Sequence, residues 1–490
     1  MEDTTQFTAE HVKAQAPDLF AQIEAAPNLG HLRARLSGYA NQIRFDTFSG
    51  ADWEAGLPVV RVRDCVRAFQ SLISRRSDDK AGFSVAQALQ DIARGVNRPD
   101  LTRAFYADIA HIILGMHGRG PGLSPADAVL APSELSGREA AIERSHQLDE
   151  LWGRLERSMD RYTPGLDEQV IERRRHRKAR ILAALGGTEE QWRDWHWQLR
   201  NSIRDVETLS EVVDLPEEVR MAVARAREAR VPMGVTPYYA SLMDEKPSEQ
   251  DRAVRHQVLP SGEYVEGLCH LRDQDPAILD FMREEDTSPI DLITRRYPQI
   301  CILKPVNTCP QICVYCQRNW EIEDAMDARG FLPQEQIEEA IGWIAEHPSI
   351  REVLVTGGDP FILSDGRLRQ ILDRLALIGS VERIRIGTRI PVTAPMRVTG
   401  ELADLLSLYS VPGRREVCVV THVQHPYEIT PDMIEAVQRL RSRRIPVYNQ
   451  LVYTFFISRR FEACALRRLL RLAGIDPYYT FNVKGKEEMM

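Results

Sequence analysis

Three cysteines in one short stretch are the residues of this chain best suited to chemistry. Cys309, Cys313 and Cys316 follow one another at intervals of four and three residues in the segment CPQICVYC. Thiolates are soft ligands, and an iron–sulfur cluster is normally held by four cysteines, so a loop with three leaves one iron without a protein ligand. The spacing differs from the ferredoxin run, whose cysteines are separated by two residues each. The stretch therefore predicts a cluster whose open iron takes part in a reaction.

A structural zinc site is the main alternative for these cysteines. Such a site needs four ligands, and Cys301, upstream of Cys309, is the obvious fourth. The paired Cys-x2-Cys knuckles that are usual in zinc sites are missing. With 8 cysteines in 490 residues, a chance match to the spacing has a probability of roughly 0.002. The cluster is the favoured interpretation, and zinc stays open as the alternative.

An alternation of apolar runs and helical periodicity begins near residue 300 and must position the cysteines. Segments such as residues 368–375 have the spacing of amphipathic helices. The expected strands cover residues 300–306, 352–356, 383–388, 416–421, 446–452 and 477–483. Six strand–helix units predict an α/β fold, a parallel sheet curled into a partial (β/α)6 barrel. In such barrels reactive groups lie at the carboxyl ends of the strands, and the cysteine loop directly follows the first strand.

The cysteine spacing, with Tyr315 directly before the third cysteine, resembles the radical S-adenosylmethionine (SAM) superfamily. In that superfamily SAM chelates the open iron of a 4Fe–4S cluster, and one electron from the cluster cleaves SAM to a 5′-deoxyadenosyl radical. Segments at 192–198, 235–244 and 285–289 extend the resemblance to lysine 2,3-aminomutase-like proteins, over residues 190 to 488. The resemblance implies a partial radical SAM barrel, a cluster on the three cysteines, and Tyr315 in the cofactor pocket.

A turn of sequence TGGDP follows the second expected strand. Gly357 and Gly358 allow backbone to approach a ligand closely, and Asp359 can accept hydrogen bonds from an ammonium group. By itself such a turn is ordinary. Its position after a strand and downstream of the cysteines resembles the Gly-Gly-Asp motif that meets the methionine amino group of SAM. The resemblance therefore assigns these three residues to SAM.

Further candidates for the cofactor pocket lie in the later strands and beside the cysteines. Arg385 and Arg389 flank the third strand in a segment similar to the family pattern, and the family's counterparts of His422 and Gln450 face SAM. A buried His or Gln inside a strand can equally be a satisfied core group, and that alternative stays open. Arg318 matches an arginine that the family uses near the phosphate of pyridoxal phosphate (PLP), a role that suits a bidentate guanidinium.

Three departures from the family concern PLP, which in aminomutases holds the substrate amino group as it migrates from carbon 2 to carbon 3. Ile300 stands in place of a second phosphate-binding arginine, and the family's PLP lysine lies in a segment beyond Met490. Lys484 replaces an aspartate that binds the lysine ammonium, which reverses the charge there and favours an acidic, glutamate-like substrate. Lys484 and Lys486 are available for an imine, or are solvated lysines paired with glutamates. PLP is therefore an open question.

The first 185 residues or so contain no catalytic constellation. We predict a helical N-terminal region (1–185), a family-like helical segment leading into the barrel (186–295), and a partial barrel that lacks the PLP-lysine segment (296–490). The basic run at residues 173–180 lies in a helix expected to end at Gly186 and Gly187. It is interpreted as a solvated face with carboxylate partners, with nucleic-acid binding as the alternative.

The composition restricts the partners. A net charge of −8 with 27% charged residues does not point to nucleic acid or an anionic membrane. No apolar run approaches about 18 residues and the N-terminus is acidic, so neither a spanning helix nor a signal peptide is expected. The scattered cysteines suit a reducing compartment, and we predict a cytoplasmic protein. An uncovered sixth strand would be a liability, which an oligomer of identical chains could cover.

The combined expectation is a radical SAM isomerase of the lysine 2,3-aminomutase type. It would abstract hydrogen from an amino acid, with 2,3-amino migration, using electrons from a donor such as flavodoxin or ferredoxin. A PLP-independent radical SAM enzyme is one alternative. A truncated, non-catalytic protein that binds the cluster and SAM is another. No single catalytic residue is assigned.

Overall fold

The computed structural model describes residues 7–49, 56–119, 135–274, 276–318 and 321–483. The chain divides into two compact units, Met1–Arg154 and Leu155–Met490, which we call the N-terminal unit and the C-terminal unit. Within the described residues, no helix has both the length and the apolar character needed to cross a membrane.

The N-terminal unit is helical, as predicted. Hydroxyl side chains begin several of its helices; Ser84 and Thr102, for example, each accept a hydrogen bond from the backbone N–H three residues on. Phe69 and Ile113 are among the apolar side chains buried between the helices. The helices are α1 (Ala9–Gln15), α2 (Pro17–Glu24), α3 (Leu29–Ser49), α4 (Gly56–Leu72), α5 (Arg75–Ala81), α6 (Val85–Ala93) and α7 (Arg103–Met116), and α9 (Gly137–Met159) runs across the boundary into the C-terminal unit.

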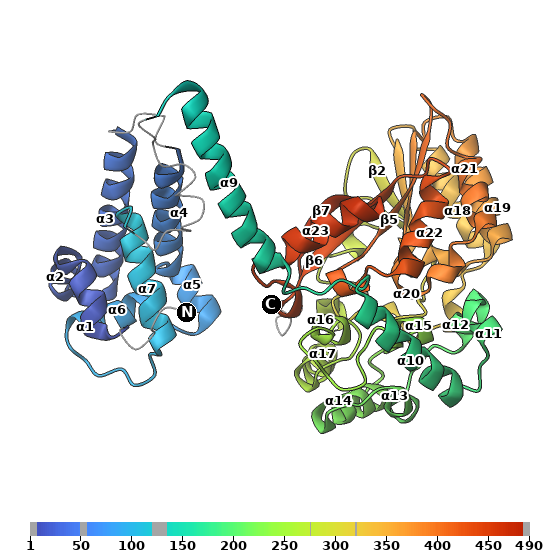
Figure 1. Ribbon diagram of the computed structural model, residues 1–490, viewed down its shortest axis with the longest axis horizontal. Coiled ribbons are helices and arrows are strands. Elements are labelled where there is room, and N and C mark those ends of the chain that lie inside the picture. The colour runs from blue at the N-terminus through green and yellow to red at the C-terminus, as the bar shows by residue number, and fades with distance from the viewer. Residues whose placement is uncertain (1–6, 50–55, 120–134, 275, 319–320, 484–490) are drawn as a thin grey trace. The chain divides into compact units, whose positions relative to one another are not determined.

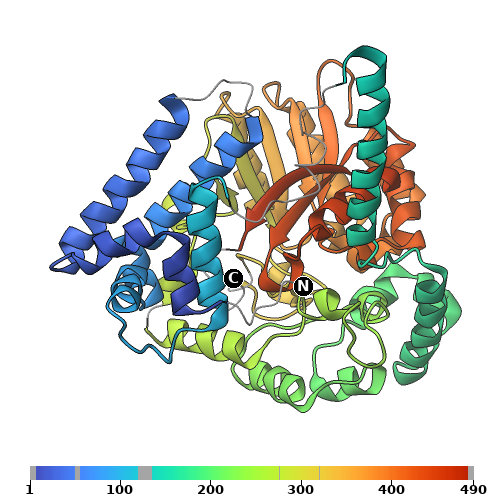
Figure 2. The same ribbon diagram turned by 60° about the vertical axis from the view of Figure 1, so that its left-hand side comes forward.

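A seven-stranded sheet organises the C-terminal unit (Figures 1 and 2). Its strands lie in chain order: β1 (Ile293–Thr294), β2 (Ile300–Val306), β3 (Glu352–Gly357), β4 (Arg383–Gly387), β5 (Glu416–Thr421), β6 (Val447–Tyr453) and β7 (Asp476–Asn482). The six strands from β2 to β7 are parallel, which confirms the predicted partial barrel. The short antiparallel β1 was not predicted.

Helices between the strands cover one face of the sheet. Val353 and Val355 of β3 and Ile384 and Ile386 of β4 are fully buried toward this layer, whereas the alternate residues face the other side. Figure 1 shows α18, α19, α21 and α22 beside the strands. The helices of this layer are α18 (Gln334–Ala345), α19 (Asp365–Leu377), α20 (Ile390–Thr393), α21 (Gly400–Ser407), α22 (Pro431–Arg441) and α23 (Glu462–Ala473).

A series of helices precedes the sheet in the C-terminal unit. They are α10 (Glu168–Ala184), α11 (Glu189–Arg193), α12 (Trp195–Arg200), α13 (Val206–Val212), α14 (Glu217–Glu228), α15 (Pro237–Ala240), α16 (Arg252–Arg255) and α17 (Gly262–Gln274). The compact units divide after Arg154 rather than near residue 185, because α10 buries Val170 and Ile181 in the same core as the sheet. The three functional regions predicted from the sequence stay a prediction.

The basic run lies on α10, which ends before Gly186 and Gly187 as expected. The interpretation as a solvated face needs correction, because Arg174 and Arg177 are buried. Arg177 donates to the Asp244 carboxylate at 3.1 Å and to the Ser241 carbonyl at 2.7 Å. Arg174 and Arg177 therefore face the interior of the C-terminal unit, while the other basic residues of the run are exposed or partly exposed.

Candidate active site

The loop with the three cysteines follows the carboxyl end of β2. Backbone hydrogen bonds tie it to the segment before the barrel: Ile312 N–H donates to Gly234 O at 3.0 Å and Val314 N–H to Gln257 O at 2.8 Å. Burial raises the pKa of the Cys309 thiol well above its ordinary value, and Asp359, Cys316 and Cys313 act in the same direction. The three thiols are therefore electrostatic neighbours, as ligands of one cluster must be.

The zinc alternative finds no support in the geometry. Cys301 is fully buried inside β2 within the apolar core, and burial raises the pKa of its thiol to about 12. Across the described ranges, no group of three or more His, Cys, Asp or Glu side chains is arranged to hold a single metal ion. A cluster of four irons differs from this case, because each thiolate binds a separate iron.

Arg389, directly after β4, is a buried cation beside the cysteine loop. Its guanidinium lies 2.8 Å from Cys313 Sγ and 2.7 Å from a carboxylate oxygen of the fully buried Glu428. It also donates to Tyr239 Oη at 3.2 Å and to Gln257 Oε1. A buried charge needs this kind of complete pairing. The predicted Arg389 thus contacts Cys313, one of the three predicted cluster ligands, directly.

Two aromatic rings enclose the same guanidinium. Its central carbon lies 5.2 Å from the Tyr239 ring centroid and 5.5 Å from that of Tyr315, both within the range of cation–π attraction. Tyr315 is itself buried, at 5% exposure. The predicted Tyr315 therefore lies beside Cys313 and Arg389.

The turn from Gly357 to Asp359 packs on the cysteine loop rather than on open space. A Cβ added to Gly358 would lie 2.1 Å from Thr308 O, and one added to Gly357, whose φ is +105°, would lie 2.5 Å from Val306 O. Gly358 N–H donates to Val306 O at 2.7 Å. The small size of the two glycines lets β3 approach the backbone that leads into the cysteines, and their contact with SAM stays a prediction.

Asp359 links this turn to β4. Its carboxylate accepts hydrogen bonds from Thr388 Oγ1 at 2.6 Å, Arg389 N–H at 2.7 Å and Phe361 N–H at 3.0 Å. A carboxylate offers about four acceptor sites, so three are occupied within the protein. Asp359 therefore orients Arg389 and leaves at most one site for an ammonium group.

His422 directly follows β5, whereas Gln450 lies in the middle of β6. The amide of Asn449 is engaged by the Val423 backbone at 2.7 and 3.0 Å. His422 Nδ1 is buried without a partner among the described residues, and so are both amide atoms of Gln311 in the cysteine loop. Burial, followed by Arg389, lowers the pKa of His422 to about 4, so its ring is neutral near pH 7.

Arg318 belongs to a charged cluster on the other side of the cysteines. Its backbone N–H lies 3.4 Å from Cys316 Sγ, and its guanidinium pairs with Glu284 and with Glu321, the latter at 2.9 Å. Lys304 of β2 donates to Glu284 at 2.8 Å. Burial alone would raise the pKa of Glu284, but Arg318 and these hydrogen bonds lower it to about 2. This cluster therefore balances two cations with two carboxylates.

The structure does not bring every predicted residue to this place. Arg385 lies inside β4, two residues before its end, and pairs with Glu352 of the neighbouring strand. Its cofactor role stays a prediction without a contact to support it. Lys484 and Lys486 lie outside the described residues.

The sequence reading did not single out Tyr239, Gln257, Glu428 or Glu284. Each contributes one side chain to a buried polar network from a segment distant in the chain. A fully buried carboxylate such as Glu428 has no local sequence signal, since its partner Arg389 is 39 residues away. The thiol set, the unpartnered His422 nitrogen and the Gln311 amide together fit a cluster with a polar cofactor beside it.

Comparison with known proteins agrees with this geometry. Residues 303–457 match the model of the radical SAM superfamily. An uncharacterized KamA family protein of Methanocaldococcus jannaschii is 40% identical over 493 aligned residues, which cover 96% of this chain and 79% of that protein.

Aminomutases are similar over a shorter stretch. An L-lysine 2,3-aminomutase of Fusobacterium nucleatum is 35% identical over 298 residues (60% of this chain), and a glutamate 2,3-aminomutase of Clostridioides difficile is 36% identical over 311 residues (63%). The alignments span 65% and 69% of those two proteins. The superfamily implies SAM and a 4Fe–4S cluster, and these relatives indicate an enzyme of the aminomutase type. The chain belongs to the KamA family of the radical SAM superfamily.

Proposed function

We propose that this chain abstracts a hydrogen atom from an amino acid at a cluster held by Cys309, Cys313 and Cys316. One observation carries the proposal. Three cysteines follow β2 in one loop, and two polar groups, His422 Nδ1 and the Gln311 amide, are buried without a partner among the described residues. Buried polar groups are normally paired, so such groups at the mouth of a barrel are expected to meet a cofactor.

A bound 4Fe–4S cluster with an open iron would pass an electron to SAM and generate the radical that removes the hydrogen atom. The protein's own contribution is to hold and orient. Arg389 donates to Cys313 Sγ and so fixes one ligand, while Tyr239 and Tyr315 keep water from the guanidinium. Hydrogen bonds to cluster sulfurs raise the reduction potential, so Arg389 favours uptake of the electron. A one-electron donor such as flavodoxin or ferredoxin would supply it.

The SAM pocket is proposed to lie between the turn at Gly357–Asp359, the end of β5 at His422 and the middle of β6 at Gln450. Asp359 is largely engaged with β4, so we assign the contact with the SAM amino group chiefly to backbone carbonyls of this turn. Neutral His422 offers one ring nitrogen as an acceptor and Gln450 offers an amide, both suited to an uncharged polar group of the cofactor.

An acidic amino acid is the proposed substrate class. Lys304 and Arg318 supply cations beside Cys316, and Lys484 adds a further cation in the sequence where lysine aminomutases are expected to have an aspartate. Glu284 and Glu321 balance Lys304 and Arg318 in the absence of a ligand, so Lys484 supplies the net positive charge. The lysine and glutamate enzymes resemble the chain to nearly the same degree, so the preference rests on these charges.

Isotope transfer tests the proposal. The anaerobically reconstituted full-length protein is reduced with dithionite in the presence of SAM and either deuterated glutamate or deuterated lysine, and 5′-deoxyadenosine is analysed by mass spectrometry. Deuterium is expected in 5′-deoxyadenosine from glutamate in excess over lysine, and none in Cys313→Ala. Deuterium from lysine alone would overturn the substrate assignment. Unlabelled 5′-deoxyadenosine with all amino acids would overturn their role as substrates.

PLP-dependent amino migration is tested separately. Borohydride reduction in the presence of PLP, followed by peptide mapping, is expected to place a phosphopyridoxyl group on Lys484 or Lys486 if the chain performs migration. Deuterium transfer without an adduct would support hydrogen abstraction independent of PLP. The two readouts therefore separate the aminomutase from the PLP-independent enzyme.

A further inference from the structure

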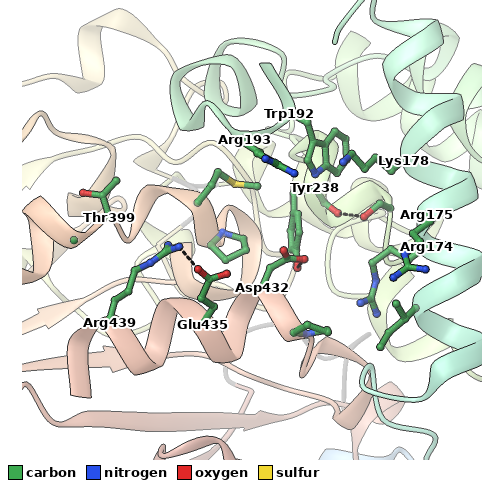
Figure 3. Close-up of a pocket in the computed structure, with 16 residues that line it drawn as sticks. Arg174, Arg175, Lys178, Trp192, Arg193, Tyr238, Thr399, Asp432, Glu435 and Arg439 are labelled. Carbon is green, nitrogen blue, oxygen red and sulfur yellow. Dashed lines mark hydrogen bonds and ion pairs between the residues drawn. The ribbon is translucent and has the colours of Figure 1, made fainter. Parts of the chain in front are cut away.

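A second cavity, of about 850 Å³, lies in the C-terminal unit between α10 and the first turns of α21 and α22 (Figure 3). Its volume is in the range of sites for small molecules. None of the cysteines and none of the predicted cofactor residues line it. It is therefore distinct from the candidate active site.

Basic side chains predominate in this cavity. Five line it against two acidic ones: Arg174, Arg175, Lys178, Arg193 and Arg439 against Asp432 and Glu435. Both acids have partners already, because Asp432 accepts from Tyr238 Oη at 3.1 Å and Glu435 pairs with Arg439. Figure 3 shows α10 supplying Arg174, Arg175 and Lys178 on one side, with the α22 residues on the other. Arg175 and Lys178 pair with Glu172 and Glu189 outside the cavity. The positive charge left for a ligand therefore comes from Arg174 and Arg193.

Arg174 is the buried member of the set, at 7% exposure. Its guanidinium contacts one protein oxygen, Gly165 O, at the long distances of 3.3 and 3.4 Å. Its Nε–H is buried and has no acceptor within the described part of the chain. Burying a guanidinium without an anion costs several kcal/mol, on the order of the desolvation penalty of an ion. An anion in the cavity would supply the missing acceptor.

Arg193 provides a second unpaired cation at the end of α11. It is exposed, lines the cavity, and has no hydrogen bond or ion pair with any described residue. Two helices also begin at the cavity, α21 at Gly400 and α22 at Pro431. Helix N-termini favour negative charge, so they add to the attraction of the two arginines.

We propose that this cavity binds a phosphate-bearing small molecule, held by Arg174 from within and by Arg193 at its mouth. Several phosphate oxygens can accept from guanidinium groups at once, which a single carboxylate does less well. Lys178 lies 5.5 Å from the Trp192 ring centroid, so an occupant at this position also comes near an indole that can report binding.

Calorimetric titration of pyrophosphate into the anaerobically reconstituted full-length protein tests the site. We expect saturable binding with one ligand per chain that weakens as salt is added, because the contacts are ionic. Arg174→Gln and Arg193→Glu should each weaken binding by about tenfold, the loss of roughly one charge-assisted hydrogen bond. Titrations of ATP and of PLP show whether a nucleotide or a phosphorylated cofactor fits better.

A charge-reversal variant outside the cavity is the control for Arg193→Glu. Arg220→Glu changes an exposed arginine of α14 that does not line the cavity and should leave the pyrophosphate affinity within twofold. Arg193 is exposed, so its variant is expected to fold even if Arg174→Gln does not. Equal affinities of Arg193→Glu and Arg220→Glu, or no saturable binding by the unaltered protein, would overturn the proposal. Binding of a single-stranded oligonucleotide in place of all three probes would also overturn it.

Discussion

Two buried arginines in the C-terminal unit have opposite surroundings. Arg389 and Arg174 are both 7% exposed. Arg389 is surrounded by protein groups, with the Glu428 carboxylate at 2.7 Å and Cys313 Sγ at 2.8 Å. Arg174 has one carbonyl at 3.3 Å and a buried Nε–H for which the described part of the chain offers no acceptor. The first guanidinium is fixed by its own chain, whereas the second lacks an anion.

The difference indicates what each arginine does. A fully paired buried cation positions its neighbours, so Arg389 belongs to the framework of the cysteine loop. An incompletely paired cation in a cavity is a feature of a binding site, because the native state keeps a desolvated donor that only a ligand satisfies. The two regions can therefore be tested against each other with equivalent substitutions.

The largest effect is expected at the paired arginine. Arg389→Gln or Glu428→Gln leaves the other charge buried and uncompensated, which should lower the free energy of unfolding by about 3–5 kcal/mol. Replacing both together should cost less than the sum of the two, because the charges disappear as a pair. Denaturant unfolding of the four proteins measures the coupling. Strict additivity would contradict a pairwise role.

The backbone under the cysteines gives the next effect. Gly358→Ala places a methyl group 2.1 Å from Thr308 O and should cost about 1–3 kcal/mol and lower the iron content after reconstitution. Gly366→Ala in α19 is the matched control, since the added Cβ meets no atom nearer than 4.0 Å and alanine favours helix. Equal iron content in the two variants would contradict the packing argument.

His422 should make stability depend on pH. Its pKa in the folded protein, about 4, lies below the ordinary value of 6.5. The unfolded chain therefore takes up a proton first, and the stability that neutral His422 contributes above pH 6.5 is lost as the pH falls toward 4. Relative to His422→Gln, the unaltered protein should lose about 1 kcal/mol between pH 7.5 and 5.5. A difference that does not change with pH would contradict the burial of a neutral ring.

The smallest effect is expected at the unpaired arginine. Arg174→Met removes a desolvated charge with one weak hydrogen bond, so the unfolding free energy without phosphate should change by less than about 1 kcal/mol, or rise. Pyrophosphate should then stabilise the unaltered protein and leave Arg174→Met unchanged. A loss as large as that of Arg389→Gln would show that the two arginines do not differ.

The strands were predicted well because local pattern determines them. β2 and β5 begin and end as predicted, since apolar runs bounded by polar residues and turns specify both strands. β1 has only two residues, which are too few for a sequence pattern to predict a strand. The buried face of α10 has a sequence signal that was missed, because its residues recur at intervals of three and four: Val170, Arg174, Arg177 and Ile181. The charges of the two arginines suggested instead that this face is exposed to solvent.

The site was predictable only where spacing or resemblance marks it. The cysteine spacing identified the loop, but the partners of Arg389 come from Tyr239, Gln257 and Glu428, which tertiary folding brings together. Arg385 was predicted to lie in the cofactor pocket, but it pairs with Glu352 of the neighbouring strand. That pairing depends on the register of the two strands. The close approach of Gly358 to Thr308 likewise depends on how two strands pack together.

The central claim is that the three cysteines hold a cluster that cleaves SAM. The most direct measurement is 5′-deoxyadenosine formed by the anaerobically reconstituted, dithionite-reduced protein, with iron and sulfide determined on the same sample. We predict about four irons and four sulfides per chain, cleavage of SAM by the unaltered protein, and none by the Cys309→Ala, Cys313→Ala or Cys316→Ala variants. Uncleaved SAM in the presence of a complete cluster, or cleavage that survives these substitutions, would contradict the account.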